Sequence, residues 1–147
     1  MSKTYIGTAI RRRVAEAAQY RCGYCLTQTL ITGVAMQIEH IIPEALGGSS
    51  KESNLWLACS TCNLYKGARC FAVDPETNQE VALFNPRQQK WSQHFVWTEN
   101  GTRILGITTT GRATVEALQM NNQHIVKSRF LWAAAGWHPP KFVTIQA

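Results

Sequence analysis

Two Cys-x-x-Cys pairs constrain this chain more than any other feature. Cys22 and Cys25 form the first pair, Cys59 and Cys62 form the second, and 33 residues separate them. Four thiolates suit a tetrahedral Zn²⁺ ion, with Zn–S distances of about 2.3 Å. Because such an ion has no open coordination position, we predict a structural zinc rather than a catalytic one. The alternative is a set of buried reduced thiols, which is also what we expect of the fifth cysteine, Cys70.

The segment between and after the pairs reads as strand, loop, strand and helix. Residues 34–42 are rich in β-branched and apolar side chains and predict a strand that ends at a proline. A loop rich in glycine and serine follows over residues 45–53, then a second short strand over residues 54–58. Residues 60–69 predict a helix with a serine or threonine near its start. A folded unit is therefore inserted within the zinc framework.

Glu39 and His40 are adjacent in the first of these strands. Successive side chains of a straight strand point to opposite faces. If both residues serve one site, the strand must bend or end there, and the nearby Pro43 is compatible with that.

Charge and composition indicate which class of molecule the chain is expected to bind and in which compartment it is expected to lie. The chain has 147 residues, 15 Lys and Arg against 9 Asp and Glu, and 45% hydrophobic residues. A net charge of +6 favours polyanions, of which nucleic acid is the commonest. No run approaches the ~18 apolar residues of a membrane span, and the first ten residues lack the apolar core of a signal peptide. We therefore expect a cytoplasmic protein, where paired cysteines indicate metal rather than disulfides.

His40, Asn54 and Asn63 follow one another with 13 and 8 residues between them. With Glu39-His40-Ile41-Ile42-Pro43, Gly47-Gly48, Asn54-Leu55 and Cys59-x-x-Cys62-Asn63-x-x-Lys66-Gly67, this spacing resembles the HNH endonuclease family, in the variant with Asn at the third position and a four-cysteine zinc. The resemblance covers about residues 21–69. The family more often has Asp at the position of Glu39.

This resemblance implies an α+β fold whose ββα-metal core frames one divalent cation. It also implies a metal-dependent endonuclease that hydrolyses DNA and leaves 5′-phosphate and 3′-hydroxyl ends. His40 would be the general base, Glu39 and Asn63 would offer oxygen ligands to Mg²⁺ or Mn²⁺, and Asn54 would brace the loop. Cys62 would fix where its neighbour Asn63 begins.

Several basic residues are candidates for holding flanking phosphates of double-stranded DNA. Lys66 and Arg69 lie one turn apart on the predicted helix. A run of three arginines, Arg11, Arg12 and Arg13, falls in a helix predicted for residues 8–19. For that run, a solvated helix face is the alternative interpretation.

The chain divides into two expected parts. Residues 1–78 hold the N-terminal helix and the zinc-braced core, and residues 79–147 hold a C-terminal part packed on it. That part is expected to contain a short strand at residues 81–84, a hairpin around Asn100-Gly101 and two helices near residues 110–120 and 121–135. These elements could pack on the core, recognise DNA or form a homodimer face. Four tryptophans, at positions 91, 97, 132 and 137, favour a packed core.

Two function classes remain open from the sequence. One is the endonuclease, and the other is a zinc-stabilised nucleic-acid-binding module without catalysis. Charge and the four cysteines support both equally, and metal-dependent cleavage separates them.

Overall fold

The structure is a computed structural model that describes residues 5–141. It is a mixed α+β fold whose short strands pair into three two-stranded antiparallel sheets within those residues. In chain order, the elements are α1 (Thr8–Ala17), α2 (Thr29–Thr32), β1 (Gln37–His40), β2 (Leu55–Ala58), α3 (Ser60–Lys66), β3 (Phe71–Val73), β4 (Glu80–Ala82), β5 (Phe95–Thr98), β6 (Arg103–Gly106), α4 (Thr109–Ala117) and α5 (Gln123–Ala134).

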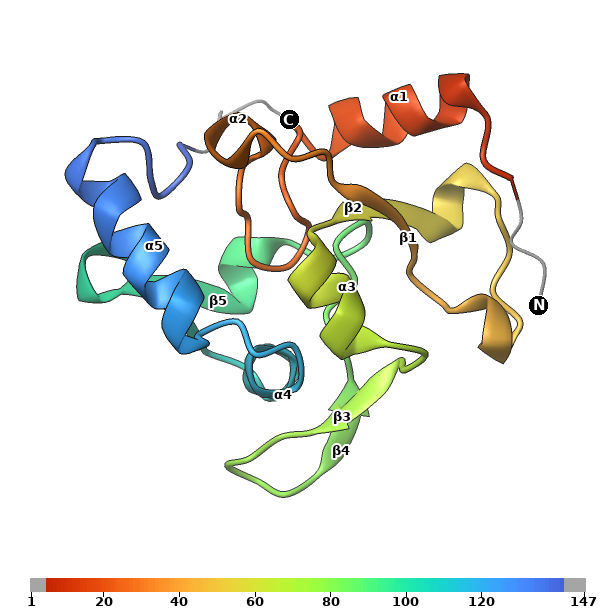
Figure 1. Cartoon of the computed structure of the whole chain (residues 1–147). Coiled ribbons are helices and arrows are strands. Elements are labelled where there is room, and N and C mark those ends of the chain that lie inside the picture. The colour runs from red at the N-terminus through yellow and green to blue at the C-terminus, as the bar shows by residue number, and fades with distance from the viewer. Residues whose placement is uncertain (1–4, 142–147) are drawn as a thin grey trace.

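The hairpin of β1 and β2 and the helix α3 form the predicted strand–loop–strand–helix unit at the centre of the molecule (Figure 1). β1 pairs with β2 in regular antiparallel register from Gln37 opposite Ala58 to His40 opposite Leu55. The cysteine that begins α3 caps it, because the sulfur of Cys59 accepts the backbone N–H of Cys62. α1 covers this unit through a small cluster of Ile6, Val14 and Leu55, whose side chains are all buried.

A second cluster forms the main core and draws on both expected parts of the chain. It joins the first Cys-x-x-Cys pair to the C-terminal strands and helices through buried residues that include Cys22, Tyr24, Cys62, Phe84, Phe95, Ile104, Leu118 and Met120. Trp91 anchors this contact, since its indole N–H donates to the carbonyl of Tyr24 at 2.7 Å. Residues 22–62 and 84–120 are thus held by one continuous hydrophobic core.

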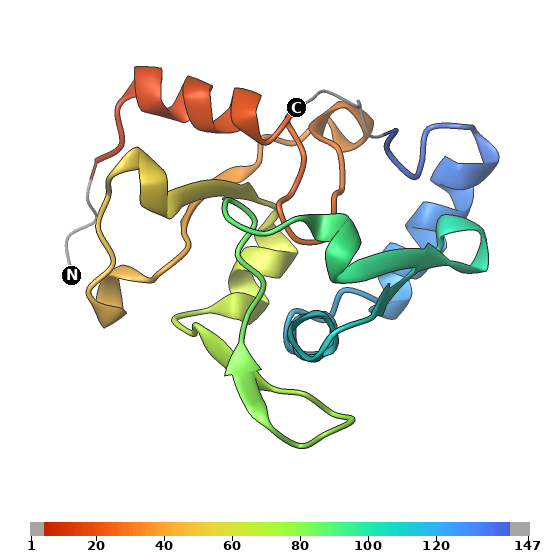
Figure 2. The same ribbon diagram turned by 180° about the vertical axis from the view of Figure 1, so that it is seen from behind.

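The β3–β4 hairpin projects away from the rest of the molecule in both views (Figures 1 and 2). Its strands pair from Phe71 opposite Ala82 to Val73 opposite Glu80. The β5–β6 hairpin lies beside α5 (Figure 1). Its connection falls at the predicted place, and Asn100 and Gly101 in it both have positive φ, 59° and 84°. No helix within residues 5–141 combines the length and apolar character that crossing a membrane requires.

Several expected details differ. The first strand is shorter than residues 34–42, and the short helix α2 precedes it. α4 begins at Thr109 and is capped by Thr108, whose hydroxyl accepts the N–H of Gly111. Trp137 is 59% exposed, so its predicted place in the core was wrong.

Candidate metal and nuclease site

The four cysteines converge as predicted. The Sγ atoms of Cys22, Cys25, Cys59 and Cys62 all lie within 4.8 Å of one another. Cys25 Sγ and Cys59 Sγ are 3.7 Å apart. A tetrahedron with Zn–S bonds of about 2.3 Å has sulfurs about 3.8 Å apart. The cluster therefore has the size and donor chemistry that would hold a structural zinc ion.

The local chain conformation explains this convergence. The first knuckle turns back on itself through a hydrogen bond from the N–H of Cys22 to the carbonyl of Thr27, 2.9 Å. Gly23 then packs against the second strand, because its N–H donates to the Leu57 carbonyl at 2.8 Å. A Cβ at Gly23 would overlap the indole of Trp56, so only glycine allows this close approach.

The sulfurs need a cation to share one buried space as thiolates. Burial raises the pKa of the Cys22 thiol well above its usual range, and the neighbouring sulfur of Cys22 does the same for Cys62. Hydrogen bonds from the other cysteines, that of Cys22 first, hold the pKa of Cys25 well below its usual range. Four thiolates this close together repel one another, so they require a bound positive ion to be charged together.

His40 is the last residue of β1, and its imidazole is held by the loop that follows. Nε2 lies 2.9 Å from the hydroxyl of Ser50 and 3.9 Å from the carboxylate of Glu44. The side chain is 18% exposed, which leaves part of the ring accessible to solvent. One ring nitrogen is therefore already engaged by the protein.

Asn54 braces that loop, as the sequence predicted. Its carboxamide oxygen accepts the N–H of Ile42 at 2.9 Å, and its NH₂ group donates to the carbonyls of Ile42 and Ser49 at 3.0 and 2.8 Å. These three bonds close the loop across its base. Asn54 therefore acts on His40 through the loop that carries Ser50.

Glu39 is only 3% exposed and lies in a buried network. The hydroxyl of Tyr24 donates to Oε2 at 2.7 Å, and the ammonium of Lys66 lies 3.0 Å from Oε1. The ammonium of Lys66 donates hydrogen bonds to the carbonyls of Ile41 and His40, 2.9 and 3.3 Å away. Oε1 of Glu39 therefore has an ion-pair partner in Lys66 but accepts no hydrogen bond. Burial raises the pKa of Glu39, while Lys66 and Tyr24 oppose that rise.

The strand does not bend at the acid–histidine pair. Glu39 stays in register with Trp56 and His40 with Leu55, so their side chains leave opposite faces of β1. Asn63 contacts neither Glu39 nor His40 through its NH₂ group, which donates to the side-chain oxygen of Gln37 at 2.6 Å. Since the acid, the imidazole and the amide each contact different groups, their meeting around one catalytic ion stays a prediction.

The structure corrects the role predicted for Lys66. Its side chain is buried, with 3% exposed, and its ammonium is committed to Glu39 and two strand carbonyls. It therefore cannot hold a flanking phosphate. Arg69 is exposed, but its guanidinium donates to the carbonyls of Lys66, Tyr65 and Ala117, which ties the end of α3 to α4.

The three arginines of α1 are all exposed. Arg11 donates to the carbonyl of Ile6 at 2.8 Å, and Arg13 pairs with Glu52 at 2.9 Å. Their contact with phosphates stays a prediction.

Sequence reasoning missed Tyr24 and Ser50. Tyr24 lies inside the first Cys-x-x-Cys pair, so its closeness to the zinc framework was visible, but its contact with Glu39 depends on the tertiary fold. Ser50 belongs to a run of glycines and serines that predicts only a loop. No local signal distinguishes it from Ser49.

Residues 22–69 match the family model described as HNH endonuclease. No curated protein and no solved structure matches the chain. The matched segment begins at the first zinc cysteine and ends just after α3, so it contains the four cysteines, the β1–β2 hairpin and the helix described above. Residues 22–69 are therefore similar to the HNH endonuclease domain, and the four-cysteine cluster fits a zinc-binding variant of that family.

Proposed function

We propose that this protein is a metal-dependent endonuclease that hydrolyses phosphodiester bonds of double-stranded DNA, with His40 as the general base. The observation that carries the proposal is the support given to His40 inside the matched segment. A loop closed by Asn54 brings the hydroxyl of Ser50 to 2.9 Å from His40 Nε2. A partly exposed imidazole held in this way suits a residue that must take a proton from water.

The second ring nitrogen would be the basic atom. When Nε2–H donates to Ser50, Nδ1 carries the lone pair that would accept the proton of the attacking water. Glu44, 3.9 Å from Nε2, would stabilise the imidazolium that results. Both contacts come from the loop after β1, so this loop would orient the base.

Glu39 and Asn63 are the proposed oxygen ligands of a catalytic Mg²⁺ or Mn²⁺ ion. Such an ion would stabilise the charge that builds on the phosphate during cleavage. To bind Glu39, the metal ion would have to displace the Lys66 ammonium, which lies 3.0 Å from Oε1 of Glu39. That oxygen accepts no hydrogen bond. Carboxylate and amide oxygens are ligands that hard cations prefer, and this supports the assignment.

A second candidate is a zinc-stabilised nucleic-acid-binding module without catalysis. The closed Glu39–Lys66 pair favours it, because Lys66 already neutralises the acid that would bind the catalytic ion. Binding without cutting would then be the whole activity, and it would weaken as salt rises.

Supercoiled plasmid incubated with the purified protein separates the two candidates. The endonuclease predicts nicked or linear plasmid with Mg²⁺ or Mn²⁺ and none after chelation of that ion. Salt-dependent duplex binding with no cleavage under any divalent metal would support the binding module and overturn the endonuclease.

A further inference from the structure

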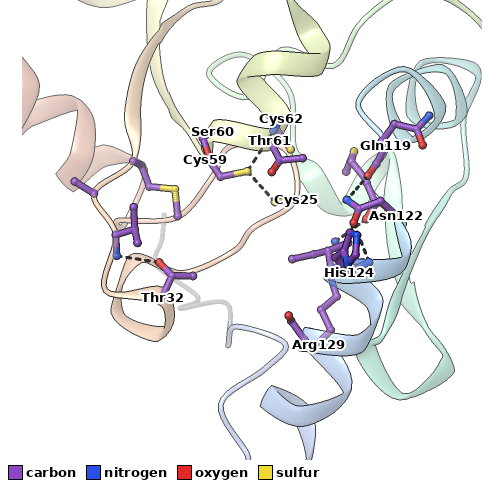
Figure 3. A pocket seen from close by; sticks show the side chains of 16 residues that line it. Cys25, Thr32, Cys59, Ser60, Thr61, Cys62, Gln119, Asn122, His124 and Arg129 are labelled. Atoms are coloured by element: carbon purple, nitrogen blue, oxygen red, sulfur yellow. Dashed lines mark hydrogen bonds between the residues drawn. The ribbon is translucent and has the colours of Figure 1, made fainter.

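A cleft of about 310 Å³ separates the four-cysteine cluster from α5. Figure 3 shows Cys25, Cys59 and Cys62 on one wall, and His124 and Arg129 from α5 on the other. Among the described residues that line this cleft there is no aspartate, glutamate or lysine. Arg129 is therefore the one of them with a permanent charge.

Arg129 is fully buried, with 0% of the residue exposed. Its Nη1 donates to the carbonyl of Thr102 at 3.0 Å and to Asn121 Oδ1 at 3.3 Å, and its Nη2 donates to the carbonyl of Met120 at 2.7 Å. The guanidinium also lies over the indole of Trp97, 5.3 Å from the ring centre. Carbonyl and amide dipoles and the face of the Trp97 indole thus surround the guanidinium charge.

No carboxylate within residues 5–141 forms an ion pair with Arg129, and its Nε has no hydrogen-bond acceptor among them. A buried charge without an opposite charge is costly to a folded protein. The same fold places a group of the missing sign across the cleft. Four thiolates outnumber the two charges of a zinc ion, so a zinc-loaded cluster is net negative.

Electrostatics agree with this placement. Burial lowers the pKa of Arg129, and negative charge on the four cysteine sulfurs acts in the opposite direction. The buried cation and the cluster therefore stabilise each other's charged forms.

We propose that Arg129 is the buried counter-charge of the zinc–thiolate centre and that this pairing couples α5 to the metal site. Arg129 is a positioning residue, since it would act on zinc through the sulfurs rather than bind it. The inference rests on the proposed occupation of the four-cysteine cluster by zinc. It gives the C-terminal helix a function in metal retention that no local motif in residues 123–134 indicates.

The test compares Arg129→Lys with Arg129→Gln in the full chain, with Lys127→Met as a control on an exposed position of the same helix. The readout is the chelator concentration that removes half of the zinc. A charge role predicts that the glutamine variant loses zinc at a chelator concentration at least tenfold lower, while the lysine and control variants stay within threefold of wild type. Absorption of the cobalt-substituted proteins reports whether the four-thiolate geometry persists.

Each outcome decides a separate point. Equal zinc retention by wild type, Arg129→Lys and Arg129→Gln would overturn the role of Arg129, and so would a tenfold loss in the lysine variant. If Arg129→Gln does not fold, Arg129→Met takes its place under the same limits. A wild-type protein that binds neither zinc nor cobalt would instead overturn the zinc site itself, whatever its nuclease activity.

Discussion

At the scale of single residues, the proposed chemistry depends on how firmly one imidazole is held. The imidazole of His40 lies within hydrogen-bond distance of the hydroxyl of Ser50, at 2.9 Å. Ser50 in turn lies in the loop that Asn54 closes. The orientation of the His40 imidazole therefore depends on Ser50 and on the loop closure by Asn54.

Replacing Ser50 by alanine should slow DNA cleavage about fivefold, because one side-chain hydrogen bond is worth about 1 kcal/mol. The rate at saturating DNA should fall more than the affinity for DNA. Ser53→Ala, an exposed serine of the same loop, is the matched control. A Ser50→Ala enzyme with the cleavage rate of wild type would show that the contact has no catalytic part.

Asp74 carries a pH prediction. The residue is 0% exposed, and its two oxygens accept Nε and Nη2 of Arg112 at 3.0 and 2.9 Å. The Arg112 guanidinium holds the pKa of Asp74 well below its usual range. Because the pKa of Asp74 is lower in the folded state than in the unfolded state, its charged form stabilises the fold at pH values above the ordinary aspartate pKa. That stabilisation is lost as the pH falls toward the lowered pKa. The gap in unfolding free energy between wild type and Asp74→Asn should therefore be largest near pH 7 and shrink below about pH 5.

Urea unfolding of both proteins at pH 7 and pH 3 measures that gap. Glu80→Gln, at an exposed carboxylate of the same hairpin, should show a much smaller pH effect. A gap that is equal at the two pH values would mean that the ion pair does not set the titration of Asp74.

At the scale of elements, the β1–β2–α3 unit is held by a buried charge pair rather than by apolar packing alone. Lys66 on α3 reaches the acid Glu39 and the carbonyls of His40 and Ile41 on and after β1. Its ammonium thereby fixes the helix against the end of the strand that carries the proposed base.

Lys66→Met should destabilise the protein by about 3–5 kcal/mol, because it leaves the buried carboxylate of Glu39 without its counter-charge. Glu39→Gln should be destabilising for the same reason. The double variant should lose clearly less than the sum of the two. Denaturant unfolding measures all three, with the exposed Lys51→Met as a control. Additive losses would show that the two charges do not depend on each other.

The sequence predicted the elements whose signals are local. The paired cysteines and the helix predicted near residues 121–135, observed as α5, follow from residue types at short spacing. β3 escaped prediction because its three residues have the burial pattern exposed, buried, exposed, with too short a run to register as a strand. Lys66 was assigned to the surface because a lysine late in a helix is usually solvated, whereas here α3 turns it toward β1.

At the scale of the whole molecule, the zinc framework and the C-terminal part share their hydrophobic core. Tyr24 lies between two cysteines of the framework, and its carbonyl accepts the indole N–H of Trp91. Such contacts join residues far apart in the sequence, so no periodicity or spacing could have predicted them. The four-cysteine framework and the C-terminal part are therefore expected to unfold together.

Removing zinc should accordingly destabilise both parts in one transition. Structural zinc sites contribute on the order of 10–16 kcal/mol of apparent binding free energy in small peptides, so its loss is large compared with domain stability. Near-ultraviolet circular dichroism of the tryptophans, four of which lie at residues 91–137, follows the C-terminal part during titration with a chelator. Retention of the native tryptophan signal after complete zinc removal would contradict the coupling.

The central claim is tested most directly by cleavage of a defined DNA duplex by wild-type protein and His40→Ala at equal, measured zinc content. The account predicts metal-dependent cuts with 5′-phosphate and 3′-hydroxyl ends by wild type, and a rate at least about 100-fold lower for the variant. Equal cleavage rates for the two proteins would contradict His40 as the general base.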